Sequence, residues 1–314
     1  MTRTRKHAWV APLLAAGVVI AGCGADDDAG TTSQTSTAKL TVQASFYPLQ
    51  WLAEQVGGDA VAVTNLTKPG TEPHDLELTP QDVAAISNAG LVVYLSGLQP
   101  AVDEAVEQQA GDKSFDAGES ANLSLKYTPI EEGEEATDEA GSVDPHFWLD
   151  PKRLAGVGEA LAARLGQAVP AQAAAFTERA RSVRTELEAL DGEYREKLAN
   201  CANKDLVTSH NAFGYLADAY GLNQVGITGL TPEEEPSPTD LAAVTEFVRS
   251  HHVRTIYYET LVSPAIAETV ARETGAETAV LDPIEGLNDD SEGENYLEVM
   301  RANLANLVTG QACS

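Results

Sequence analysis

The sequence has few cysteines, few aromatic residues and few basic side chains. Its 314 residues include 3 Cys and 2 Met, and aromatic residues make up only 6%. Lys and Arg number 20 against 48 Asp and Glu, so the formal net charge is −28. A surface with this excess of negative charge repels nucleic acid and anionic lipid and attracts cations. Nucleic acid is therefore excluded as a partner, although solubility or a high-salt habitat would explain the charge equally well.

Long apolar runs are absent beyond the N-terminus, so no transmembrane helix is expected there. The run from Ala8 to Ile20 is too short to span a bilayer, and it follows the basic residues Arg3, Arg5 and Lys6. The pattern predicts a signal peptide over residues 1–22. Its end, Ile20-Ala21-Gly22-Cys23, resembles a bacterial lipobox, which implies cleavage before Cys23 and acylation of that residue. We expect an exported protein held by lipid at the outer face of the cell membrane; the alternative is an ordinary secretory signal.

The length and the 43% hydrophobic content allow about two domains with sizeable cores. Residues 23–38 have no apolar period and are predicted to be a disordered, lipid-anchored tether. We expect an N-terminal lobe over 39–170, a linking helix over 171–200 and a C-terminal lobe over 201–314. The protein is expected to be a monomer.

Strand patterns alternate with helix patterns through both predicted lobes. Strands are expected near 40–45, 61–66, 91–95, 122–125, 206–209, 224–227, 255–259 and 278–281. Residues 171–200 have helical period without proline, and one helix of that length would be about 45 Å long. The alternation predicts an α/β fold of two parallel-sheet lobes joined by one long rigid helix.

An acidic run over 131–142 interrupts the first lobe. It contains Gly and Ala among its carboxylates and has nothing to bury. A solvated surface loop is one interpretation, and weak recruitment of cations is the other.

Two cysteines, Cys201 and Cys313, remain if Cys23 is acylated. An even pair in an exported chain favours a disulfide, and two free buried thiols are the alternative. The bond would close a loop of about 112 residues and stabilise the fold by roughly 4–5 kcal/mol on the chain-entropy model.

Six histidines are the main candidates for binding chemistry. His7 belongs to the signal peptide, and His251-His252 lie at a predicted helix C-terminus, where the helix dipole favours a cation. The other three, His74, His146 and His210, all lie in loops next to strand or helix ends. Together with Asp282, which follows a predicted strand, they would form an N3O set that suits Zn²⁺. Spacing alone leaves structural roles open for each of them.

Four motifs occur in order along the chain: Glu72-Pro73-His74-Asp75, Asp144-Pro145-His146-Phe147-Trp148-Leu149-Asp150, Ser209-His210-Asn211-Ala212-Phe213-Gly214-Tyr215 and Leu281-Asp282-Pro283. With Pro236-Ser237-Pro238 and Tyr258-Glu259, they resemble the zinc-specific solute-binding proteins of metal-uptake ABC transporters, from Leu40 to the C-terminus. The resemblance implies a metal in an interlobe cleft. His74 and His146 would come from the first lobe, and His210 and Asp282 from the second.

The resemblance also implies a function: an extracytoplasmic protein, not an enzyme, that captures Zn²⁺ as its transported ligand and delivers it to a membrane permease. Manganese-type relatives have Glu where this chain has His210, so His210 favours zinc. The loop before His146 departs from the family, because zinc-type relatives often carry a His-rich tract there. Glu72 is a candidate for an alternate carboxylate ligand or for the hydrogen-bond partner of a metal-bound histidine.

Three alternatives to zinc capture remain open at this point. The same scaffold could carry Mn²⁺ or Fe²⁺. A secreted zinc hydrolase is a second alternative, but the chain lacks His-Glu-x-x-His and Asp282 would fill the open coordination position. An extracellular scaffold with a structural metal is the third.

Overall fold

The computed structural model describes residues 38–130 and 140–314, and residues 38–314 belong to one compact unit. The predicted signal peptide 1–22, the predicted acylation site Cys23 and nearly all of the tether 23–38 lie outside the described residues, as does most of the acidic run 131–142. Within the described residues, no helix has both the length and the apolar character needed to cross a membrane.

The first half of the chain forms a four-stranded parallel sheet with the order β2-β1-β3-β4. Its strands are β1 (Leu40–Ala44), β2 (Val61–Asn65), β3 (Leu91–Tyr94) and β4 (Ser114–Asp116). The accompanying helices are α1 (Tyr47–Gly57), α2 (Pro80–Asn88), α3 (Pro100–Gln109) and α4 (Gly118–Ala121). α2 begins with a capping box, in which the side chains of Thr79 and Asp82 each accept a hydrogen bond from the other's backbone N–H.

The strand expected near 122–125 is wrong. The fourth strand is β4, and Asn122 instead ends α4 in the left-handed conformation with a φ of 54°. β4 is a three-residue edge strand with all three residues only half-buried, so it has no apolar run for a sequence pattern to detect.

The second half repeats the same topology, with the strand order β6-β5-β7-β8 and all pairs parallel. Its strands are β5 (Asp205–Thr208), β6 (Asn223–Gly226), β7 (Thr255–Tyr258) and β8 (Glu277–Val280). Its helices are α7 (Gly214–Tyr220), α8 (Pro238–Ser250), α9 (Ala265–Thr274) and α10 (Tyr296–Gly310). Two parallel sheets with helices confirm the predicted fold class, and in such sheets ligands bind beyond the carboxyl ends of the strands.

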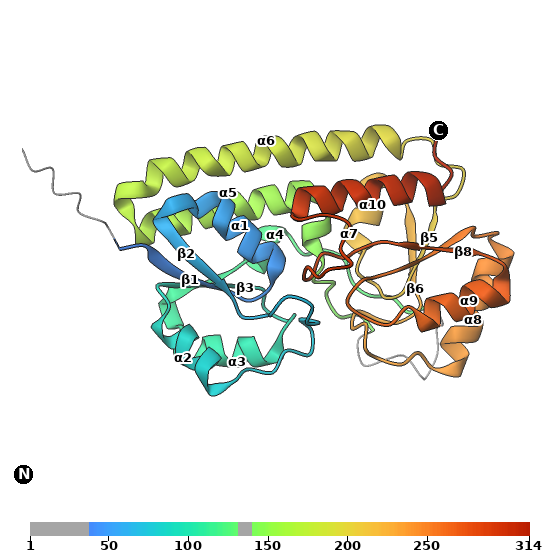
Figure 1. The fold of residues 1–314 in the computed structure, drawn as a ribbon, viewed down its shortest axis with the longest axis horizontal. Coiled ribbons are helices and arrows are strands. Elements are labelled where there is room, and N and C mark those ends of the chain that lie inside the picture. Colours follow the sequence, from blue (N-terminus) through green and yellow to red (C-terminus); the bar gives the residue numbers. More distant parts are fainter. Residues whose placement is uncertain (1–37, 131–139) are drawn as a thin grey trace, which may run out of the picture. The chain divides into compact units, whose positions relative to one another are not determined.

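Two helices connect the sheets, α5 (Pro151–Ala168) and α6 (Ala173–Lys197). Asp150 caps α5, because its side chain accepts a hydrogen bond from the backbone N–H of Lys152. α6 has 25 residues, about 37 Å at 1.5 Å per residue, and follows a 3-10 turn over Pro170–Gln172. It lies along α5 and also contacts α1 and α10 (Figure 1). The long helix is therefore supported along its length by both halves of the fold.

A disulfide joins Cys201, just before β5, to Cys313, just after α10. It confirms the predicted pairing over a sequence separation of 112. The disulfide therefore fixes the C-terminal end of the chain near the C-terminus of α6.

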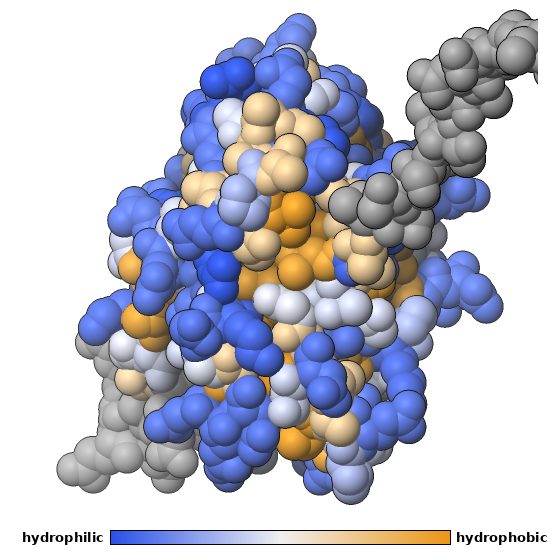
Figure 2. Space-filling model, turned by 90° about the vertical axis from the view of Figure 1, so that its left-hand side faces the viewer, coloured by the Kyte–Doolittle hydropathy of each residue, from blue (hydrophilic) through white to orange (hydrophobic). Residues whose placement is uncertain are grey.

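The largest cluster of buried apolar side chains runs from the first sheet through α5 and α6 to α10, and two smaller clusters lie against α8 and α9 and against α2 and α3. Figure 2 shows hydrophilic residues over most of the face it presents, with apolar residues gathered near its middle. Among the described residues, Val143 is the one large hydrophobic residue classed as exposed, at 47%.

Candidate metal centre

His74 lies in the loop between β2 and α2. Its backbone N–H donates to Glu72 Oε1 at 3.0 Å, which holds the loop in a tight turn. The residue is 9% exposed, and its Nε2 atom has no hydrogen-bond partner among the described residues.

His146 is held in the turn before α5 by Asp144. One carboxylate oxygen, Asp144 Oδ1, accepts from the backbone N–H of His146 at 2.9 Å and lies 2.8 Å from its Nδ1. The ring is fully buried and packs beside the buried Trp148. A donor role for Nδ1 leaves the lone pair of Nε2 free for a metal, as in carboxylate–histidine–zinc triads.

His210 follows β5 by two residues and repeats this arrangement. Its Nδ1 lies 2.7 Å from Glu259 Oε1, which also accepts from the Ser209 hydroxyl at 2.7 Å. Glu259 directly follows β7, so two neighbouring strand ends bring the pair together. Both side chains are buried.

Glu285 completes the cluster from the loop after β8. Its Oε1 lies 3.1 Å from His146 Nε2, 3.4 Å from His74 Nε2 and 3.5 Å from the Nε2 of the third histidine, His210. All four residues are buried, and their ligand atoms lie within 4.8 Å of one another. None of these four atoms has a hydrogen-bond partner among the described residues, so they converge on one point that a cation would satisfy.

The electrostatics of the cluster show how strongly the charges interact. Burial would lower the pKa of His146 and His210, but the neighbouring carboxylates outweigh it and raise both pKa values, that of His210 well above its usual range. Burial would raise the pKa of Glu285, yet the three imidazoles hold it well below its usual range. Burial, together with the charge of Glu285, raises the pKa of Glu72 to about 10. The protein atoms alone therefore favour the protonated, positively charged form of His146 and His210.

Asp282, predicted as the fourth ligand, is not part of this cluster. Its Oδ1 accepts from the backbone N–H of Ile284 at 2.7 Å, and its Oδ2 accepts from the hydroxyls of Thr260 at 3.1 Å and Ser291 at 3.3 Å. Asp282 thus builds the turn, and Ile284 within it has a positive φ of 59°, which redirects the chain. The carboxylate that reaches the histidines is Glu285, three residues further on.

Glu72 lies beside the cluster, in the same loop as His74. Its Oε1 accepts a hydrogen bond from the backbone N–H of His74, and its Oε2 has no partner among the described residues. The carboxylates that orient histidine rings are Asp144 and Glu259. Asp144 stands two residues before His146 in a quoted motif, and Glu259 lies in a second, so both signals were present in the sequence.

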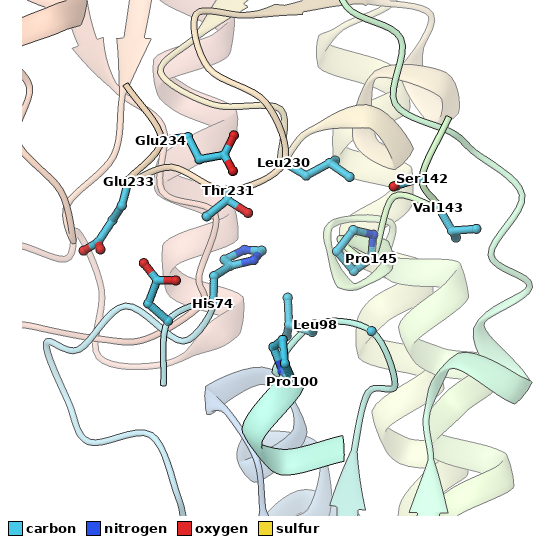
Figure 3. A pocket seen from close by; sticks show the side chains of 12 residues that line it. His74, Leu98, Pro100, Ser142, Val143, Pro145, Leu230, Thr231, Glu233 and Glu234 are labelled. Atoms are coloured by element: carbon cyan, nitrogen blue, oxygen red, sulfur yellow. The ribbon is translucent and has the colours of Figure 1, made fainter. Parts of the chain in front are cut away.

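A cavity of about 450 Å³ opens beside His74 (Figure 3). Asp75 and Glu233 line it from the two halves of the fold, and the carboxyl of Asp75 within hydrogen-bond reach raises the pKa of Glu233. His74 is the one residue of the cluster among those lining this cavity. The cavity therefore reaches the edge of the cluster at His74.

The fold and the cluster define a class: a two-lobed α/β metal-binding protein with three histidines and a glutamate between its sheets. The model of the family described as zinc-uptake complex component A, periplasmic, matches residues 42–310, and the chain belongs to this family. It is 36% identical to the zinc-binding lipoprotein AdcA of Streptococcus pneumoniae over 283 residues, covering 87% of this chain and 56% of AdcA. The chain thus spans about half the length of that relative.

A second relative is similar over its whole length. The chain is 32% identical to the high-affinity zinc uptake system protein ZnuA of Bacillus subtilis over 314 residues, with 96% of each chain covered. Among solved structures, the laminin-binding protein Lmb of Streptococcus agalactiae has a TM-score of 0.76 at 34% identity, covering 87% of this chain and 99% of Lmb. Lmb is described as a bifunctional protein with adhesin and metal-transporting activity. The Zn(II)-bound ZnuA-like domain of AdcA has a TM-score of 0.71 at 34% identity, covering 87% of this chain and 99% of that domain.

Proposed function

We propose that this protein captures Zn²⁺ outside the cytoplasm and delivers it to the membrane permease of an ABC transporter. One observation carries the proposal: the Nε2 atoms of His74, His146 and His210 and a carboxylate oxygen of Glu285 converge without hydrogen-bond partners. Family membership and relatives named for zinc binding and zinc uptake support the same assignment.

The ligand set favours zinc over manganese. Three imidazoles and one carboxylate suit tetrahedral Zn²⁺, with Zn–N distances of about 2.0–2.1 Å, whereas Mn²⁺ prefers more oxygen ligands. The ligand atoms lie within 4.8 Å of one another, and those of a tetrahedral zinc site lie about 3.3–3.4 Å apart. Side-chain movements of about an ångström would therefore bring the ligands onto the ion.

The architecture supports capture and transport rather than hydrolysis. A fourth protein ligand, Glu285, occupies the position that a zinc hydrolase keeps for water. The cavity beside His74 gives the ion a path in and out.

The remaining proposals concern location and organisation. We propose that residues 1–22 direct export and that lipid on Cys23 anchors the chain through the tether 23–38 to the outer face of the cell membrane, where the protein acts as a monomer. The lobes 39–170 and 201–314, linked by 171–200, would hold the metal between them. The relative named a zinc-binding lipoprotein supports the anchor.

Calorimetric competition between Zn²⁺ and Mn²⁺ tests the proposal on the soluble chain from Leu40 onward, stripped of metal beforehand. One tight zinc site with weak manganese binding is expected. The Glu285→Gln variant should bind zinc at least tenfold more weakly, whereas Asp282→Asn, which keeps the acceptor for Ile284, should stay close to the parent protein. Manganese binding as tight as that of zinc would refute zinc specificity.

A further inference from the structure

A second group of buried carboxylates adjoins the zinc cluster. Glu72, Glu259 and Glu285 each offer an oxygen atom, and these three atoms lie within 4.8 Å of one another. The residues are only 7%, 2% and 0% exposed, respectively. They come from the loops after β2, β7 and β8, so both sheets contribute to the group.

Several oxygens of this group lack donors among the described residues. Oε2 of Glu72, Oε2 of Glu259 and both oxygens of Glu285 have no hydrogen-bond partner there. The other oxygens of the first two are occupied: one by the backbone of His74, the other by His210 and Ser209. Buried carboxylate oxygens without donors are costly, and in proteins they are normally paired or bound to metal.

One zinc ion does not balance the charge at this place. Four buried carboxylates surround the histidines: Asp144, Glu259, Glu285 and Glu72. With neutral imidazoles and all four carboxylates ionised, a single Zn²⁺ leaves two negative charges in excess.

We propose that Glu72, Glu259 and Glu285 form a second cation site, which takes a hard divalent cation such as Ca²⁺ or Mn²⁺ beside the zinc. The inference rests on the proposed function, because Glu285 would bridge the two ions with its two oxygens. Oxygens up to 4.8 Å apart can share a cation at about 2.3–2.6 Å, the usual range for Ca²⁺.

The two sites would differ in selectivity. The histidine cluster offers three nitrogens, which suit Zn²⁺, whereas the carboxylate group offers oxygens alone, which suit Ca²⁺, Mg²⁺ and Mn²⁺. The second ion would remove the excess negative charge and hold Glu285 in place. Zinc affinity should therefore rise when the hard cation is present.

The test is a titration of the zinc-loaded protein with Mn²⁺. Electron paramagnetic resonance measures free Mn²⁺, and native mass spectrometry counts zinc and manganese per chain. The parent protein should hold one zinc and one manganese, with Ca²⁺ competing for the second position. Glu72→Gln should keep its zinc and bind the second ion at least tenfold more weakly.

Glu77→Gln is the matched control, because Glu77 is an exposed acid in the same loop and its loss changes the net charge equally. This variant should behave like the parent. Equal manganese binding by the parent and Glu72→Gln would overturn the proposal, and a proton would then neutralise the group. Loss of zinc as manganese binds would also overturn it, since manganese would then occupy the histidine site. A parent protein that binds no zinc would instead refute the proposed function.

Discussion

The three histidines of the cluster are held in two different ways. His146 and His210 are buried to within 1%, and each has a carboxylate within 2.8 Å of its Nδ1. His74 is more exposed, at 9%, and is fixed through its backbone N–H. It also lines the cavity that leads outward. In the proposed zinc site, His146 and His210 are therefore preorganised, whereas His74 is the ligand next to the cavity.

Removing one of the three histidines should have the largest effect on zinc affinity. The binding free energy of a four-ligand zinc site is about 10–16 kcal/mol, which is roughly 3 kcal/mol per ligand. His146→Ala or His210→Ala should therefore weaken zinc binding about 10²- to 10³-fold. His74→Ala should cost less, because water from the cavity can replace the imidazole. Competition with a chelator of known affinity measures all three. An effect of His74→Ala as large as that of His210→Ala would show that His74 contributes as much to zinc binding as the histidines with carboxylate partners.

Acid should release zinc because protons compete with zinc for His146 and His210. Their pKa values are raised, so below the raised values they carry protons, which zinc must displace from the ring nitrogens. Affinity should fall as pH falls through these pKa values and level off above them. For each proton that zinc displaces, the zinc affinity should change about tenfold per pH unit. Zinc titrations across pH 5–9 measure the slope, and a flat profile would contradict the coupling.

The carboxylates behind the histidines should have the next largest effect. Asp144→Asn and Glu259→Gln remove the charge that orients each ring, and loss of such partners typically lowers metal affinity about 10- to 100-fold. Asp205→Asn is a suitable control, because Asp205 pairs with the exposed His251 instead. Calorimetry on the three variants separates the outcomes. Parent-like affinity for both Asp144→Asn and Glu259→Gln would show that ring orientation does not depend on them.

The smallest effect is expected from the contact between the two ligand-bearing turns. The Trp148 indole N–H donates to the carbonyl of Pro283 at 2.7 Å, and thereby ties the turn of His146 to the turn of Glu285. Trp148→Phe leaves that buried carbonyl unsatisfied, at a cost of about 1–3 kcal/mol. We expect zinc release several-fold faster in stopped-flow chelation.

Tyr194→Phe is the matched control for that variant, because its hydroxyl bonds the carbonyl of Met300 elsewhere in the core. It should lower stability without changing the release rate. Equal release rates in the parent and Trp148→Phe would show that the turns are held together by other contacts.

Much of this site could be predicted from the sequence. Each histidine motif places its ring beside a strand or helix end, and parallel sheets bring such ends together. The fourth ligand could not be predicted in the same way. Asp282 follows β8 closely and carries the expected chemistry, but its carboxylate is used to cap its own turn. The left-handed Ile284 then turns the chain so that Glu285 reaches the histidines. A β-branched residue gives no sequence signal for that conformation.

The most direct measurement is a crystal structure of the zinc-loaded protein with anomalous data at the zinc edge. The account predicts one zinc peak bound by the Nε2 atoms of His74, His146 and His210 and by Glu285, with Asp282 still bonded to Ile284. Zinc bound by Asp282 in place of Glu285, or zinc away from the histidines, would contradict it.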